Sequence, residues 1–302
     1  MRSTVLELLE ELGPRSRHAR LLMATAAAWA VSGAVHIGVW AVAGGSLSGA
    51  VSWRKPIVFS ISIGLTLWAV GWVLDRMPTS RSRLAGAIAW TFAVASTIET
   101  ALIVMQTWRG RASHFNVFAA GDAVVFGVMG FMVGVMSLAL ITLFVWTLIE
   151  PPGDTATRWA VVAGLAAVVA GLGFGQWLIT LGTRYASEFA AVPSTVMNGG
   201  AVAKFPHAVG FHGIQVFALL GALCKGAGVG TARRSQAMRS AVAGYAGLLV
   251  FATIQTVGGL APLALRPWSL ALLAASGLAL AWAFSTVFAA RRRRRVPATL
   301  AA

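Results

Sequence analysis

Eight apolar runs of about 20 residues, separated by charged or Pro- and Gly-containing segments, constrain this chain more than any other feature. A helix of about 20 residues crosses roughly 30 Å of hydrocarbon, so lipid is the solvent that such runs require. Only 11% of the 302 residues are charged, which is too few to cover a globule in water. We therefore expect an all-α fold, a polytopic transmembrane helical bundle of about eight spans. The predicted spans are 21–43, 56–74, 85–107, 117–149, 159–182, 207–224, 241–262 and 268–290.

The distribution of Lys and Arg predicts the orientation of the bundle. With the N-terminus inside, the inner segments hold seventeen of these residues and the outer loops hold seven. Because cytoplasmic loops carry the excess of positive charge, we expect both termini in the cytoplasm and the bundle in the cell membrane, as a bacterial inner-membrane protein. The net charge of +15 then reflects orientation and contact with the lipid bilayer, and no nucleic-acid partner is expected.

The chain divides into three predicted parts. Thr4 and Glu7 have the spacing of a capping box, and the apolar face that follows stops at Gly13-Pro14, which predicts a cytoplasmic interfacial amphipathic helix. A single transmembrane bundle and a basic cytoplasmic tail follow this helix. The one cysteine, Cys224, excludes an intrachain disulfide and leaves His and carboxylate as metal ligands. The three parts are residues 1–20, 21–290 and 291–302.

Polar side chains inside the spans are few, and each is costly unless it faces the bundle interior or a water-filled cavity. Measured from the predicted outer ends, they lie at one depth, about 8–12 Å below the outer boundary at 1.5 Å per residue. The inner halves of the spans hold no such side chain. This asymmetry predicts a site that opens to the outer side. Its members are His36, Glu99, Asp122, Gln176, His212, Gln215 and Gln255.

Two residues are candidate catalytic groups, and three glutamines are candidate ligand-binding groups. Glu99 can change its charge within the layer and has no Lys or Arg at i±4, and His114 lies nearer the rim. Gln106 shares a helical face with Glu99, whereas Gln176 and Gln215 lie on other spans. The alternative for each glutamine is a structural hydrogen bond between helices.

Basic and aromatic segments border this layer on the outer side. Arg54, Lys55 and Arg109 stand where the positive-inside bias disfavours charge, so we expect them to bind an anionic group or another small-molecule ligand from the outer side. The alternative is that Arg and Trp at the boundary only anchor the helices. The outer loop 183–206 is long enough to serve as a lid.

Three stretches carry a resemblance to known proteins. They are SWRKP at 52–56, TWRGRASHFN at 107–116 and KFPHAVGFHGIQ at 204–215. The chain resembles an uncharacterised family of bacterial multi-pass membrane proteins along most of its length. The resemblance implies a similar bundle and no particular activity.

The leading hypothesis from these residues is a membrane enzyme or redox protein that holds haem or a transition metal. His36 and His212 are the expected ligands, with His207 nearer the rim, and glycines beside the deeper pair leave room for a flat group. His207 and His212 are five residues apart, which leaves their rings roughly 140° apart on a straight helix, so one metal held by both is not expected. The alternatives are a proton-coupled small-solute transporter that uses Glu99, and a cofactor-free lipid-binding, small-molecule-binding or assembly protein. Spacing does not choose between enzyme and transporter, and it predicts no oligomeric state.

Overall fold

The computed structural model describes residues 2–295 and confirms the all-α bundle. Eight helices in this part of the chain are long and apolar enough to cross a membrane, so the protein is a multi-pass membrane protein. The elements are α1 (Arg2–Leu12), α2 (Arg17–Ala43), α3 (Arg54–Leu74), a short 3-10 helix η1 (Thr79–Arg81), α4 (Ser82–Trp108), α5 (Ala120–Ile149), α6 (Thr155–Phe189), β1 (Met197–Asn198), β2 (Ala201–Val202), α7 (Lys204–Gly226), α8 (Thr231–Val257) and α9 (Pro267–Arg295).

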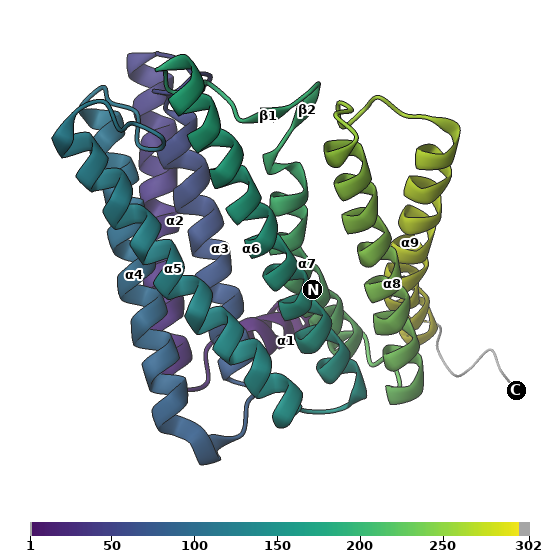
Figure 1. The fold of residues 1–302 in the computed structure, drawn as a ribbon. Coiled ribbons are helices and arrows are strands. Elements are labelled where there is room, and N and C mark those ends of the chain that lie inside the picture. Colours follow the sequence, from purple (N-terminus) through teal and green to yellow (C-terminus); the bar gives the residue numbers. More distant parts are fainter. Residues whose placement is uncertain (1, 296–302) are drawn as a thin grey trace, which may run out of the picture.

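The long helices alternate in direction and pack mainly against their neighbours in the chain (Figure 1). α2 packs on α3, α6 on α7 and α8 on α9, and α3 also contacts α4 and α7. The bundle therefore has two ends. The α1 end carries α1 and the connections 75–81, 150–154 and 227–230, whereas the hairpin end carries the connections 44–53, 109–119, 190–203 and 258–266.

Side-chain caps fix the starts of α2 and α6. The Ser16 hydroxyl accepts a hydrogen bond from the Ala19 amide, and the Asp154 carboxylate accepts one from the Thr157 amide. Asp75, at the end of α3, accepts hydrogen bonds from the Arg15 and Ser16 amides at 2.7 and 2.8 Å. These bonds fix the turn between α1 and α2 against the end of α3.

Glycines allow the closest helix contact in the core. A Cβ atom at Gly210 of α7 would lie 2.7 Å from the Gly171 Cα atom of α6, so these two backbones touch only because neither residue has a side chain. The glycines of α5 are different. A Cβ atom at Gly127, Gly130 or Gly134 would meet nothing within 4 Å, so this face packs against no other described helix of the chain.

At the hairpin end, two helix boundaries differ from the predicted spans by five residues or more. α6 continues to Phe189, because the Arg184 and Glu188 side chains pair at 2.7 Å across one turn beyond the apolar run. α8 ends at Val257, because the positive φ of Gly259 (69°) turns the chain and the Leu260 amide bonds to the Gln255 carbonyl. The predicted outer loop 183–206 is therefore shortened to 190–203, and it contains the two-stranded hairpin of β1 and β2.

Candidate functional site

The loop 109–119 at the hairpin end is organised around one carboxylate. Asp122 is 4% exposed, and its two oxygens accept hydrogen bonds from the Gln106 amide at 2.9 Å and the Asn116 amide at 3.0 Å. The Arg109 guanidinium bonds to the Gln106 oxygen at 2.7 Å and lies 3.7 Å from Asp122. Gln106 and Arg109, which the sequence suggested as ligand-binding residues, are thus occupied in holding this loop.

Phe115 fixes the direction of the same loop. Its φ of 60° is unusual for a residue with a side chain, and its ring packs against α6 at Gly182. A Cβ atom at Gly182 would lie 2.3 Å from the Phe115 ring, so α6 can accept this ring only at a glycine. Because the ring is anchored, the preceding residues Ser113 and His114 turn towards α3.

Lys55, Ser113 and His114 form a chain of hydrogen bonds at the start of α3. The Lys55 ammonium donates to the Ser113 oxygen at 3.4 Å, and the Ser113 oxygen lies 2.9 Å from the His114 Nδ1 atom. Burial, followed by the charge of Lys55, lowers the pKa of His114 to about 3. His114 is therefore neutral at pH 7, and its Nδ1 atom can accept the Ser113 proton. The Phe59 ring packs 5.4 Å from the His114 ring.

Positive charge gathers where α3 and α7 begin. Arg54 and Lys55 are the first two residues of α3, and Lys204 is the first residue of α7, which packs on α3. Within residues 2–295, none of the three makes an ion pair with a carboxylate. A helix N-terminus carries a partial positive charge, so cations are unfavourable there. The arrangement favours an anion at this position.

His36 belongs to an aromatic cluster that occupies both of its ring nitrogens. Nδ1 lies 2.7 Å from the Ser32 carbonyl, and Nε2 accepts a hydrogen bond from the Trp108 indole at 3.1 Å. The Trp53 and Trp108 rings pack edge to face at 5.2 Å beside it. To bind a metal, His36 would have to give up one of these bonds.

The structure does not bring the three metal-ligand candidates together. His36 lies on α2 and His212 on α7, and α3 packs between these helices (Figure 1). The His207 Nδ1 atom lies 2.8 Å from the Gly171 carbonyl, and its ring packs on Phe211 at 4.8 Å. In the described part of the chain, no three His, Cys, Asp or Glu side chains are placed to hold one metal ion. The haem or metal hypothesis stays a prediction from the sequence.

Glu99 is buried in α4 with 5% exposure. Its carboxyl makes no hydrogen bond or ion pair within the described residues, whereas the neighbouring Ser96 hydroxyl donates to the Ala93 carbonyl at 3.2 Å. A carboxyl group in such a place is costly as a carboxylate and binds a proton readily. Of the two candidate catalytic residues, Glu99 therefore retains the chemistry of a proton site.

Gln176, Gln215 and Gln255 do not form a site together with Glu99. Gln176 is exposed on α6. The Gln215 amide contacts only backbone carbonyls, that of Leu65 at 3.3 Å in one orientation and that of Phe211 at 2.9 Å in the other. Gln255 lies in the last turn of α8 and donates to the Ala261 and Ala264 carbonyls at 3.3 and 3.2 Å. The predicted layer is therefore partly a set of loop and helix hydrogen bonds.

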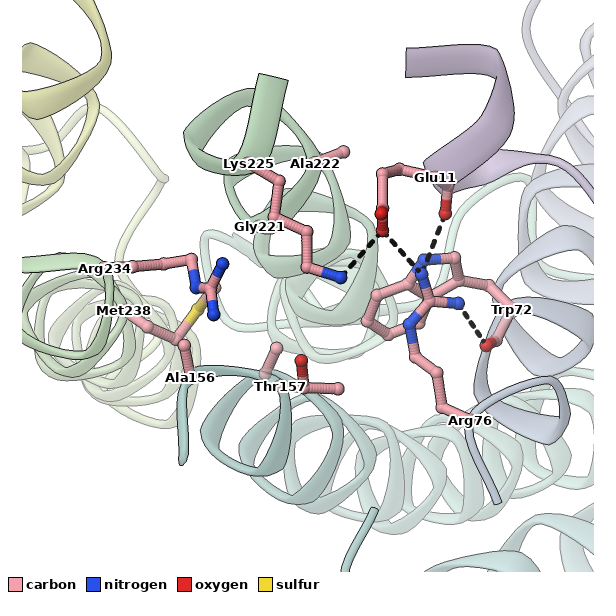
Figure 2. Close-up of a pocket in the computed structure, with 11 residues that line it drawn as sticks. Glu11, Trp72, Arg76, Ala156, Thr157, Gly221, Ala222, Lys225, Arg234 and Met238 are labelled. Carbon is pink, nitrogen blue, oxygen red and sulfur yellow. Dashed lines mark hydrogen bonds and ion pairs between the residues drawn. The ribbon is translucent and has the colours of Figure 1, made fainter. Parts of the chain in front are cut away.

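A second charged cluster, which sequence reasoning did not single out, lies at the α1 end (Figure 2). Glu11 of α1, Arg76 after α3, Lys225 of α7 and Arg234 of α8 line a pocket there. The three cations lie at the end of the bundle that the charge distribution predicts to be the inner one, and the excess of Lys and Arg expected there accounts for them. The only signal in the sequence was Glu11, a carboxylate on the helix that precedes the first span.

The bundle thus carries a cluster of cations at each end. Comparison with protein-family models, with curated proteins and with solved structures finds no match. No related protein therefore assigns a role to either cluster. The chemistry of the two clusters is the basis for assigning a function.

Proposed function

We propose that this membrane protein binds a small organic carboxylate at its hairpin end, which the charge distribution predicts to be the outer side. The observation that carries the proposal is the group of three cations, Arg54, Lys55 and Lys204, in the first turns of α3 and α7 without a carboxylate partner in the described chain. A bound carboxylate would neutralise this charge and interact favourably with the two helix N-termini.

Lys55 and Phe59 give the site a polar and an apolar part. The two residues are one helical turn apart on α3, so they share a face. The carboxylate would pair with the Lys55 ammonium, whose position is fixed through Ser113, and the apolar part of the ligand would contact Phe59 beside His114. The loop held by Asp122 keeps these groups in place before the ligand arrives, which lowers the entropic cost of binding.

A thermal-shift titration of the purified protein in mild detergent tests this proposal. Acetate, succinate and benzoate are the probes, and chloride at equal ionic strength is the reference. We expect at least one carboxylate to stabilise the wild type and Lys55→Gln to weaken that effect by about tenfold or more, as loss of a charged hydrogen bond implies. The matched control is Arg111→Gln, which removes an exposed positive charge from the loop 109–119 at the same end of the bundle. Equal losses in both variants, or no response to any probe, would contradict the site.

Proton-coupled transport of the carboxylate is a second candidate function, and the buried, unpaired Glu99 favours it. In proteoliposomes, a pH gradient should drive uptake of labelled succinate or benzoate. Glu99→Gln should abolish this uptake and leave binding at Lys55 intact, because the two groups have separate tasks. Uptake that is independent of the gradient and of Glu99 would reduce the proposal to binding alone.

The competing hypothesis from the sequence is a haem- or metal-binding enzyme that uses His36, His207 and His212. Absorbance spectra and metal analysis of the purified protein distinguish it from the anion-binding function. A Soret band or stoichiometric metal that is lost in His212→Ala would support the metal hypothesis, and the cations near Lys55 would then be partners for haem propionates.

A further inference from the structure

Residues of five helices line the pocket at the α1 end, which has a free volume of about 10 Å³ beside Glu11, room for about one water molecule (Figure 2). Ala156 and Thr157 of α6 and Gly221 and Ala222 of α7 form its floor. A Cβ atom at Gly221 would meet nothing closer than the Met238 methyl group at 3.7 Å, so the space above this residue is free of backbone. Charged side chains surround the opening on both sides.

Three cations and one carboxylate line the pocket. Lys225 bonds to Glu11 at 2.9 Å, and the Arg76 guanidinium lies 3.6 Å from the same carboxylate and stacks on the Trp72 ring at 3.8 Å. Arg234 stands on the opposite wall and pairs with Asp154. Burial alone would raise the pKa of Glu11, but the hydrogen bond and charge of Lys225, with Arg15 and Arg76, outweigh it and lower this pKa.

Two buried donors in the pocket have no partner. The indole Nε1 atom of Trp72, a residue with 3% exposure, makes no hydrogen bond, and neither does the guanidinium Nε atom of Arg234. A buried donor without an acceptor is costly, so such groups usually have a partner when the protein is in its working state. Both residues line the same pocket, whose other charged groups are mainly cations. An acceptor with several oxygens and negative charge would complement this arrangement.

We propose that this pocket binds a phosphate group, and that Glu11 occupies the place of that group while the pocket is free. The pocket lies at the end of the bundle, at the level where membrane headgroups would surround the helix ends. Basic pockets between transmembrane helices on the cytoplasmic side bind anionic lipid headgroups. The phosphate comes either from an anionic phospholipid or from a soluble phosphate compound, since the recognition chemistry is the same. The phosphate oxygens accept from Lys225 and Trp72 and displace the Glu11 carboxylate from α7.

Lipid retention of the purified full-length protein tests the proposal. The protein is placed in nanodiscs of phosphatidylglycerol with phosphatidylcholine, or of phosphatidylcholine alone, and retained lipids are counted by native mass spectrometry. In a separate arm, inorganic phosphate and glycerol phosphate are titrated in a thermal-shift assay. Preferential retention of phosphatidylglycerol identifies a lipid source, whereas stabilisation by the soluble probes alone identifies a soluble source.

Two variants on one ion pair should change binding in opposite directions. Lys225→Gln removes a cation and should weaken phosphate binding by about tenfold or more, whereas Glu11→Gln removes the competing carboxylate and should strengthen it. Trp72→Phe removes the unpaired N–H group together with part of the ring on which Arg76 stacks, and it should also weaken binding while the Glu11–Lys225 ion pair stays intact. The control is Arg239→Gln, which removes an exposed charge near the same end and should change nothing.

The sign of the Glu11 effect distinguishes a binding site from a structural ion pair. If the cluster only joins α1 to α7, Glu11→Gln and Lys225→Gln will both lower the melting temperature and neither will increase phosphate binding. That result, or equal losses in Lys225→Gln and Arg239→Gln, would overturn the proposal. If Lys225→Gln does not fold, Trp72→Phe and Glu11→Gln still decide the question.

Discussion

Ser113 connects the cation and the histidine of the hairpin-end site through one oxygen atom. Its hydroxyl accepts from Lys55 at 3.4 Å and lies 2.9 Å from His114. Replacing it by alanine leaves the charge in place and releases the ammonium from its fixed position. We therefore expect Ser113→Ala to weaken carboxylate binding by about three- to tenfold, which corresponds to the loss of one ordinary hydrogen bond. Isothermal titration measures this effect, and an unchanged affinity would show that Lys55 needs no positioning.

The protonation of His114 gives a second prediction at this scale. Its pKa lies near 3, below the ordinary value of 6.5, because burial and the Lys55 charge disfavour the imidazolium. The neutral form therefore contributes stability that is complete above pH 6.5 and is lost as the pH falls towards 3. The His114 ring itself should therefore add no pH dependence to carboxylate binding between pH 8 and pH 6. NMR of the histidine rings, with His114→Gln for assignment, should show a neutral ring over this range, and titration near pH 6.5 would contradict it.

Residue chemistry explains part of what the sequence could predict. Lys55 and His114 were identified because charge and imidazole are rare at an outer boundary. Gln106 and Arg109 were interpreted as ligand-binding groups because their contact with Asp122 could not be predicted. Asp122 follows them across a loop, and no sequence pattern shows that this loop brings the three side chains together. The orphaned N–H group of Trp72 has no sequence signal, since an unpaired donor is a property of packing.

At the scale of elements, α1 is held to the bundle by hydrogen bonds at its end. Asp75 accepts from the Arg15 and Ser16 amides, and the Trp68 indole donates to the Leu12 carbonyl at 3.1 Å. Asp75→Ala should destabilise the turn between α1 and α2 by about 1–2 kcal/mol, the usual effect of losing a cap. Hydrogen exchange of residues 8–20 reports this opening, with Glu10→Ala as an exposed control. Unchanged exchange would show that Trp68 and Glu11 suffice.

Acid should loosen the same element. The pKa of Glu11 lies below its usual value, so the ion pairs of this carboxylate contribute stability that is present above that usual value. The contribution is lost as the pH falls through the lowered pKa. Limited proteolysis within α1 should therefore be slow at pH 7 and faster near pH 4. Glu11→Gln should remove much of this pH dependence, and a wild-type rate that does not change with pH would contradict the role of the ion pairs.

The end of α8 shows why the depth of a residue in the membrane could not be predicted accurately from the sequence. The predicted layer assumed that α8 extends to residue 262, but the glycine turn ends it at Val257. Gln255 therefore lies in the last turn and bonds to the following loop. Hydropathy extends the span because residues 260–263 continue the apolar run, whereas the helix ends at the turn formed by Gly258 and Gly259.

At the scale of the whole molecule, the eight-helix bundle followed from the eight apolar runs, but the α1 pocket could not be predicted from them. Its central ion pair joins Glu11 to Lys225, which are 214 residues apart. No periodicity connects two such positions. The sequence implies that both charges lie at the same end, since the six spans between them return the chain to the side where it began, and only packing decides that they meet.

Orientation determines what each cluster can encounter, and it can be measured directly. The native Cys224 is buried, so single cysteines can be introduced at the exposed residues Ser48 and Ser80 after Cys224→Ala. A membrane-impermeant maleimide should label Ser48→Cys in intact cells, and it should label Ser80→Cys only after permeabilisation. The reason is the excess of Lys and Arg at the α1 end, seventeen against seven. The reverse labelling pattern would place Lys55 in the cytoplasm and the phosphate pocket outside, so the carboxylate would be a cellular metabolite and the lipid an outer-leaflet one.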